Sequence, residues 1–277
     1  MEKLTEQSLQ EKIDNLDFDQ RFCLTNVPDS LYHGSEGVGS TAMKSAVKSM
    51  AHFQEYMNGQ SYSDTTLKAF TLGSAVHTLV LEPELFNDRY VMQPPSIKVR
   101  RGKDWEAFKA ANRDKEILSS NDLALARRMS ETTIQLCGRF FSGGSSEKSY
   151  WYRHPCGMVL KARIDYEIGD AAIDLKTTIA DTPEKFAKVV KYDYAVQDSL
   201  YRLVSGLPDM LYVGVCKAPP HSIFLCKQGE DVRERADHMV ELTIDSLLDA
   251  DMNDSWPNMP VELIETELSA WESNNGV

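Results

Sequence analysis

Two alternations of charged and apolar residues constrain this chain more than any other feature: Lys161–Asp165 and Asp174–Thr178. Successive side chains of a β-strand point to opposite faces. Each segment therefore places its charged residues on one face, and Gly169–Asp170 between the segments is a tight-turn signal. We predict a β-hairpin that gathers two carboxylates and three cations on one surface: Lys161, Arg163, Asp165, Asp174 and Lys176.

This charge pattern has two interpretations. Carboxylates paired across a hairpin suit a hard divalent cation, and neighbouring cations suit an anionic substrate, which points to metal-dependent phosphodiester chemistry. Asp165 and Asp174 would then coordinate Mg²⁺ or Mn²⁺, and Lys176 would orient or polarise the attacking water. The alternative is a solvated sheet face with cross-strand ion pairs. The hairpin pattern alone favours neither.

Composition excludes some classes of protein. The net charge of −12 and the pI near 5.0 argue against a nucleic-acid coat protein, but not against an enzyme whose cations line one channel. No apolar run approaches the roughly 20 residues of a membrane span, and the N-terminus lacks the regions of a signal peptide. The five cysteines are widely spread without a C-x-x-C pair. We therefore expect a cytoplasmic protein with reduced thiols and no contact with a membrane.

The order of the predicted elements indicates a mixed α/β domain. We expect a loosely attached acidic extension at 1–30, one domain at 31–255 and a C-terminal tail at 256–277. Periodicity predicts helices near 40–56, 66–81, 105–115, 121–136, 182–206 and 231–250. It predicts strands near 149–154, 158–167, 171–177, 211–217 and 221–227. Pro94–Pro95 opens an irregular, mobile loop that carries Arg100, Arg101 and Lys103.

Candidate site residues also lie on two of these helices. Gln197 and Tyr201 are four residues apart, so they share a helix face and would bracket a phosphate or a base. The alternative for this pair is a core tyrosine with a polar neighbour. His77 lies in an apolar helix, where a lone histidine is more often a hydrogen-bonded core residue than a metal ligand. Glu82 is a second, weaker candidate near the end of the same helix.

These residues, in this order, resemble the PD-(D/E)XK nuclease superfamily. The ordered set is His77, then Lys161-x-Arg163-x-Asp165, Asp174-x-Lys176 and Gln197-x-x-x-Tyr201. More narrowly, it is similar to the RecE (exonuclease VIII) type of phage and prophage recombination exonuclease. Two further segments match that group, at 72–83 around the histidine and at 40–53 in the first helix. The resemblance runs from about Tyr32 to about Lys227, and it implies a restriction-endonuclease-like core with a central mixed sheet flanked by helices.

The resemblance also implies a role for each matching position. Two Mg²⁺ ions, replaceable by Mn²⁺, would be held by Asp165, Asp174, His77 and the carbonyl group of Leu175. Lys176 would be the catalytic lysine, and Arg163 would contact the terminal 5′-phosphate of DNA. Ser40, at a helix start, is a plausible second phosphate donor because helix N-termini bind anions. Further DNA contacts would come from Lys161, Gln197, Tyr201, Arg100, Arg101 and Lys103, with Glu82 behind the metal ligands.

The function that the resemblance implies is a Mg²⁺-dependent 5′→3′ exodeoxyribonuclease. It would digest one strand of linear duplex DNA and leave a 3′ overhang for a RecT-type single-strand annealing protein. Relatives form homo-oligomeric rings, so a trimeric or tetrameric ring with an acidic outside would reconcile the charge of −12 with a DNA substrate. Two alternatives remain open: a nuclease of other polarity or substrate, such as flaps or single strands, and a catalytically silent DNA mimic or recombination partner.

Overall fold

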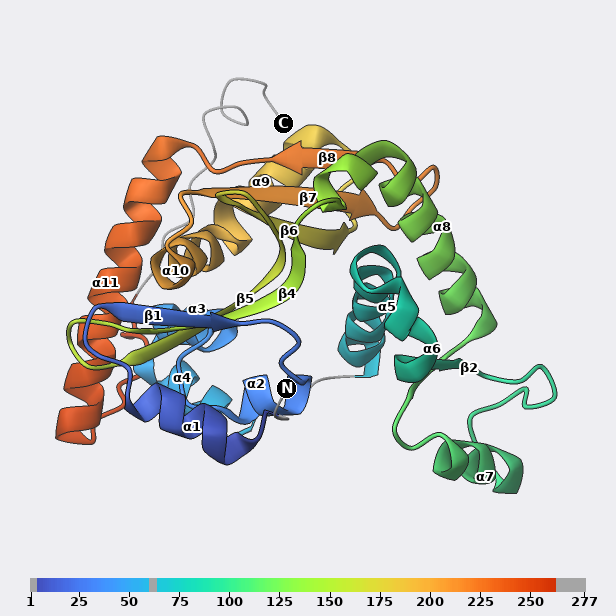
Figure 1. Cartoon of the computed structure of the whole chain (residues 1–277), viewed down its shortest axis with the longest axis horizontal. Helices are drawn as coiled ribbons and strands as arrows, with labels where there is room; N and C mark the ends of the chain where they lie inside the picture. The colour runs from blue at the N-terminus through green and yellow to red at the C-terminus, as the bar shows by residue number, and fades with distance from the viewer. Residues whose placement is uncertain (1–3, 60–63, 263–277) are drawn as a thin grey trace.

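The computed structural model describes residues 4–59 and 64–262 and is built on a six-stranded mixed sheet (Figure 1). The strand order is β1-β4-β5-β6-β7-β8. The β6–β7 pair is parallel and the other pairs are antiparallel. The predicted mixed α/β fold is confirmed. The strands are β1 (Gln20–Leu24), β4 (Ser145–Arg153), β5 (Val159–Ile168), β6 (Ala171–Thr178), β7 (Asp209–Cys216) and β8 (Ile223–Cys226).

The predicted hairpin is formed by β5 and β6. The two strands pair from Ile168–Ala171 to Tyr166–Ile173, and Gly169 takes a left-handed backbone conformation (φ +60°) in the turn. Glycine adopts that conformation without strain. The regular pairing stops at Tyr166–Ile173, so the two strands diverge where the next residues are Asp165 and Asp174. Divergence of the strands opens space for functional groups between them.

A helical crossover connects β6 to the parallel strand β7. It consists of α9 (Pro183–Asp193) and α10 (Ala195–Ser205), so the helix predicted at 182–206 is divided at Tyr194. Thr182 caps α9 by accepting the N–H of Lys185, as expected for a threonine followed by proline. Gly206 ends α10 in a left-handed conformation (φ +76°). The crossover places α10 against β5.

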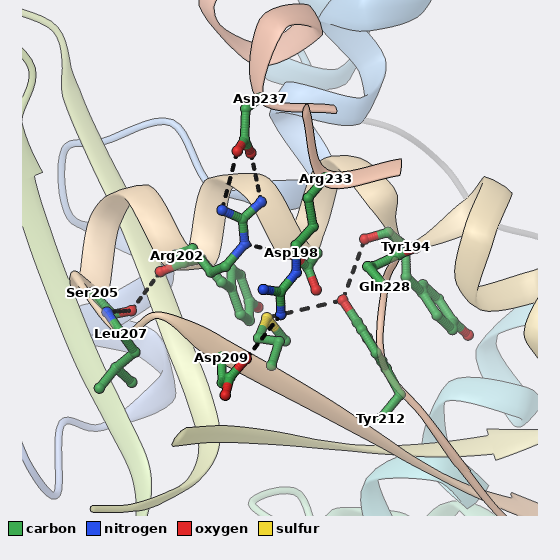
Figure 2. A network of polar contacts seen from close by, with 12 residues as sticks. Tyr194, Asp198, Arg202, Ser205, Leu207, Asp209, Tyr212, Gln228, Arg233 and Asp237 are labelled. Carbon is green, nitrogen blue, oxygen red and sulfur yellow. Dashed lines mark hydrogen bonds and ion pairs between the residues drawn. The ribbon is translucent and has the colours of Figure 1, made fainter. Parts of the chain in front are cut away.

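A network of ion pairs fixes α10 to α11 (Glu230–Asn253) and to β7 (Figure 2). Arg202 donates to Asp198 on its own helix at 2.7 Å and to both carboxylate oxygens of Asp237 at 3.1 and 2.6 Å. Arg233 of α11 lies 3.2 Å from Asp209 of β7. Asp198 is 1% exposed. A carboxylate that is buried needs such partners to remain charged.

Helices cover both faces of the sheet. One face is covered by α3 (Ser40–Lys48), α4 (Met50–Met57), α10 and α11, and the other by α5 (Asp64–Leu81) and α8 (Ser120–Cys137). The single helix predicted at 40–56 is divided at Ser49, which is extended (φ −171°) and accepts the N–H of His52. A serine that caps a new helix in this way can interrupt a continuous apolar stripe.

The N-terminal segment is part of the fold. In α1 (Glu6–Asp14) the side chains of Leu9 and Ile13 are buried in a third cluster, which contains Trp151 of β4. β1 extends the sheet by pairing with β4. The expectation of a loosely attached extension is therefore wrong for these elements, because α1 buries an apolar side. α2 (Asp29–Gly34) follows. Residues 1–3 and most of the predicted tail, 263–277, lie outside the described residues.

A small subdomain separates α5 from α8. It contains η1 (Pro83–Leu85), α6 (Phe86–Arg89), β2 (Tyr90–Met92), α7 (Lys103–Ala111) and β3 (Glu116–Leu118), and η2 (Gly138–Phe141) follows α8. β2 and β3 form a two-stranded parallel sheet. We call residues 93–115 the α7 arm, which Figure 1 shows apart from the large sheet. No helix within the described ranges is long and apolar enough to cross a membrane.

Candidate active site

Asp174 and Lys176 form a buried ion pair on β6. The ammonium of Lys176 lies 2.8 Å from Oδ1 and 2.7 Å from Oδ2 of Asp174, whose residue is 1% exposed. Gln197 of α10 donates its amide N–H to the same Oδ1 at 2.5 Å. Oδ2 is close to the ammonium, but the angles are poor, and it has no hydrogen-bond partner among the described residues. Oδ1 of Asp174 thus has two donors, whereas the one close polar partner of Oδ2 among the described residues is the ammonium of Lys176.

Asp165 lies where the strands diverge and joins β5 to β6 through its side chain. Its Oδ2 accepts the N–H of Leu175 at 2.8 Å. His77 of α5 lies 3.5 Å from the same oxygen through Nδ1, while its Nε2 contacts the carbonyl oxygen of Leu175. A carbonyl oxygen has two lone pairs, so that of Leu175 can orient the imidazole and still face a ligand. The structure therefore brings together His77, Asp165 and Leu175, as predicted.

Glu147 is a further carboxylate at this site, and sequence reasoning missed it. It lies on β4 opposite Asp165, between the pairs Ser146–Tyr166 and Lys148–Ile164, and its backbone is left-handed (φ +48°). One ligand atom each from His77, Glu147 and Asp165 lie within 4.8 Å of one another. The predicted strand began at residue 149, so Glu147 was placed in a loop. A positive φ that redirects one side chain leaves no trace in an alternation pattern.

The electrostatics of the site follow from its burial. Burial raises the pKa of Asp165, and Asp174 adds to this effect while His77 opposes it. Burial and the neighbouring Asp165 raise the pKa of Glu147 to about 8, against the attraction of Arg163. Burial disfavours the charge of Lys176, but the carboxylates of Asp174 and Asp165 outweigh it and raise its pKa. A concentration of carboxylates that resist ionisation is typical of a cation site without its cation.

A pocket of about 890 Å³ opens beside these carboxylates. Asp165 and Glu147 line it together with the N-terminus of α3. Gly39, the residue before that helix, offers no side-chain cap, so the first N–H groups of α3 have no such partner. Ser40 and Tyr201 also line the pocket. These two residues, each predicted to contact DNA, therefore lie at the same pocket.

Arg163 lines the same pocket and is firmly held. Its guanidinium donates to Asp29, to the Ser149 hydroxyl at 2.9 Å and to the Val27 carbonyl at 2.9 Å. It also stacks over the ring of Tyr32, 4.2 Å from the centroid. These contacts fix the direction of the guanidinium, although Asp29, 71% exposed in its side chain, can give way to a stronger anion. A phosphate would be such an anion.

Lys161 is engaged by the protein itself. It is 7% exposed, and its ammonium donates to the carbonyl groups of Tyr32, His33 and Ser35 at 2.9, 3.3 and 2.6 Å. A lysine has three donors, so these carbonyls leave none for a phosphate. The alternation pattern identified the face correctly, but α2 and the loop after it cover that face at Lys161. In this structure Lys161 anchors the pocket wall.

The four remaining predicted residues lie outside the cluster of His77, Glu147 and Asp165. Glu82 is 9% exposed and forms an ion pair with Arg89 at 2.6 Å, outside the three-ligand cluster. Arg100 belongs to the α7 arm, where it donates to the Ile117 carbonyl at 2.9 Å and stacks over Trp105. Arg101 and Lys103 are exposed on the same arm. The structure does not bring these three arm residues together with the carboxylates.

The donor set fits a hard divalent cation. Carboxylate oxygens, a backbone carbonyl and one imidazole are ligands that Mg²⁺ and Mn²⁺ accept. The residues that would hold an ion are His77, Glu147 and Asp165, whose ligand atoms lie within 4.8 Å of one another, with the Leu175 carbonyl beside His77. Asp174 lies outside that cluster, and its Oδ2 contacts the ammonium of Lys176.

The sheet topology and the Asp165, Asp174-x-Lys176 hairpin define a protein of the PD-(D/E)XK nuclease superfamily. More specifically, residues 39–267 match the model of the PDDEXK-like domain of unknown function (DUF3799), and the chain belongs to that family. The predicted superfamily is therefore confirmed.

A solved structure supports the same fold. The chain is similar to a "putative exonuclease" from Eubacterium rectale, with 15% identity, a TM-score of 0.59, and coverage of 92% of this chain and 100% of that one. SSO0001 is more distant, at 13% identity and a TM-score of 0.31 over 62% of this chain and 85% of that one. No curated protein sequence matches the chain significantly.

Proposed function

We propose that this chain is a Mg²⁺-dependent 5′→3′ exodeoxyribonuclease of the RecE (exonuclease VIII) type. It would act on linear duplex DNA and leave a 3′ single-stranded overhang. The observation that carries the proposal is the buried Asp174, whose Oδ1 accepts from both Lys176 and Gln197 and whose Oδ2 has no hydrogen bond among the described residues but lies 2.7 Å from the ammonium of Lys176. Asp165, His77 and Glu147 gather at the same divergence of the hairpin.

The residues of the site divide the chemistry between them. A bound divalent ion would supply positive charge at the phosphate oxygens and lower the pKa of its water. The carboxylates of Asp174 and Asp165 raise the pKa of Lys176, which favours its charged form. As a cation it would donate an N–H to the attacking water or to the charge that grows on the phosphate. Its ion pair with Asp174 keeps that ammonium in place.

The pocket supports recognition of a DNA end. Arg163 and Ser40 line it together with the N-terminus of α3, whose N–H groups and dipole favour an anion. A terminal 5′-phosphate bound there would lie beside Asp165, which also lines the pocket. Arg163 would exchange Asp29 for that phosphate. We therefore assign Arg163 and Ser40 to the 5′ end and leave Lys161 to the pocket wall.

The α7 arm is a second candidate surface for DNA. Between residues 98 and 115 it carries seven basic and three acidic side chains, in a chain whose net charge is −12. Exposed basic groups bind duplex DNA with the release of counterions, so the binding constant falls as salt is added. Each phosphate contact contributes about −0.9 to the slope of log K against log salt concentration. Arg101→Gln with Lys103→Gln should weaken binding and flatten that slope, while Lys188→Gln on α9 should do neither. An unchanged slope would remove the arm from the proposal.

The biological role and the assembly follow from the same resemblance. The 3′ overhang would serve a RecT-type single-strand annealing protein in recombination. A homo-oligomeric ring of three or four chains would enclose the duplex and keep the acidic exterior away from other DNA. Light scattering at working concentration tests this assembly, and a strictly monomeric protein would contradict it.

Digestion of defined DNA substrates tests the activity itself. The wild-type chain should degrade 5′-phosphorylated linear duplex with Mg²⁺ and not with EDTA, and should spare nicked circular and single-stranded DNA. Asp174→Asn should abolish cleavage, and it preserves more of the contacts of Lys176 than alanine would. Preference for single strands or flaps would establish a different nuclease. DNA binding without cleavage of any substrate would favour the silent recombination partner.

A further inference from the structure

Lys44 of α3 is a partly buried lysine that the proposed chemistry does not use. Its ammonium lies 3.4 Å from Oε1 of Gln197 and 5.3 Å from the centre of the Tyr194 ring. The ammonium of Lys176 faces the same ring at 5.1 Å. Within the described residues, Lys44 forms no ion pair with a carboxylate. Two lysines therefore lie near one ring, and only Lys176 has an acid as its direct partner.

The position of Lys44 has an energetic cost. Burial and the nearby ammonium of Lys176 lower the pKa of Lys44 to about 8, although Asp174 opposes the shift. A methionine of similar length would fill the same space without burying a charge. The fold alone therefore gives no reason for a lysine here, and a reason should be sought in what its ammonium contacts.

Its contact with Gln197 decides which way that amide points. An ammonium can only donate hydrogen bonds, and an ionised carboxylate can only accept them. Gln197 lies between Lys44 and Asp174, so its oxygen must face Lys44 and its nitrogen must face Asp174. The reversed amide would place its oxygen against a carboxylate and its N–H groups against an ammonium. Asp174 already disfavours the reversed orientation, and Lys44 disfavours it from the other side.

We propose that Lys44 is a positioning residue that holds the amide of Gln197 so that it donates to Oδ1 of Asp174. The carboxylate then keeps the orientation in which Oδ2, now in contact with Lys176, would bind the metal. This inference rests on the proposed function. Oδ1 of Asp174 accepts from both Gln197 and Lys176, whereas Oδ2 is left without a hydrogen bond in the described structure. If the amide reversed, Oδ1 would lose one donor and the carboxylate could rotate. Metal affinity should then fall.

A double-mutant cycle tests this inference. The variants are Lys44→Met, Gln197→Ala and the two combined, with Lys48→Met as the control because Lys48 is exposed on the same helix. Mg²⁺ affinity is measured by calorimetry without DNA, and thermal unfolding is measured beside it. Partners that orient a metal ligand typically contribute about 10–100-fold in affinity. We expect Lys44→Met to weaken Mg²⁺ binding about 10-fold and to leave the unfolding temperature unchanged or higher.

The cycle also separates positioning from direct action. If Lys44 acts through Gln197, the double variant should bind Mg²⁺ no more weakly than Gln197→Ala alone. Independent losses that multiply, or normal affinity in Lys44→Met, would overturn the inference while leaving the nuclease proposal intact. A fall in unfolding temperature that accounts for the lost affinity would also overturn it, because Lys44 would then only support the fold.

A third measurement tests the inference without Mg²⁺ binding or DNA cleavage. It therefore still applies if the wild-type chain does not bind Mg²⁺ and does not cleave DNA. The side-chain amide signals of Gln197 can be identified in a ¹⁵N spectrum by their loss in Gln197→Ala. These signals should shift and exchange faster with solvent in Lys44→Met, and they should be unchanged in Lys48→Met. Unaltered Gln197 signals in Lys44→Met would refute the inference. A wild-type chain that binds no Mg²⁺ and cleaves no DNA would refute the proposed function separately.

Discussion

Replacing Lys161 by methionine separates a structural role from a DNA-binding role. The ammonium of Lys161 donates to three backbone carbonyls, of Tyr32, His33 and Ser35. Hydrogen bonds to a charged group contribute about 1.5–3 kcal/mol each, or about 4.5–9 kcal/mol for three. Methionine avoids burying an ammonium, which offsets several kcal/mol of that loss. We expect a net loss of about 2–4 kcal/mol in the free energy of unfolding.

Urea and thermal unfolding measure this loss. For a chain of this size each kcal/mol corresponds to roughly 2–4 °C in Tm. Lys188→Met serves as the control, because Lys188 is exposed on α9. DNA binding is measured in parallel at several salt concentrations. If Lys161 instead contacted phosphate, the Lys161→Met variant would keep its Tm. The slope of log K for DNA against log salt concentration would then become shallower by about 0.9. That result would refute the assignment of Lys161 to the pocket wall.

Three further predictions concern the core, the ion-pair network and the added carboxylate. A Cβ at Gly214 would approach the Phe186 ring to 2.5 Å. Gly214→Ala should therefore lower the free energy of unfolding in urea by about 1–3 kcal/mol. An unchanged urea midpoint would contradict the packing of α9 on β7. Arg202→Met should cost about 3–5 kcal/mol at neutral pH, because it leaves Asp198 buried without its main partner. Burial already raises the pKa of Asp198, and Arg202 opposes that shift. A carboxyl with a raised folded-state pKa costs stability increasingly as the pH rises above its unfolded pKa of about 3.9, so the loss should shrink as the pH is lowered toward about 4, and a pH-independent loss would refute this. Glu147→Gln should weaken Mg²⁺ binding at least about 10-fold in calorimetry without lowering Tm, and normal affinity would remove Glu147 from the site.

The parts of the fold that could be predicted from the sequence are those governed by local periodicity. The β5–β6 hairpin has strict alternation and a glycine turn, so both its strands and its charged face were predictable. β1 was missed because Gln20–Leu24 shows no clear alternation and gains its place only by pairing with β4. Ser49 was missed as a helix break because a capping serine resembles any other serine until the chain turns there.

The site was predictable in its residues more than in its contacts. An ordered motif set identified Asp165, Asp174 and Lys176, because those positions are linked by strand geometry. It could not show which side chains the protein itself would occupy, and α2 engages Lys161 from more than 120 positions away. Glu147 and Lys44 were missed because their roles depend on which segments pack against the hairpin. Such long-range contacts leave no residue spacing in the sequence that would predict them.

Both faces of β6 are covered by helices, and this determines the order in which parts of the molecule unfold. Ile173 and Leu175 are buried under α5 and α8, while Ala172 is buried with the helices of the opposite face. Amide protons of this strand should therefore exchange with solvent only through global unfolding, whereas β1, at the edge, should exchange through local fraying. On gentle heating, the edge of the sheet at β1 would therefore loosen while β6 still held Asp174 and Lys176 in place.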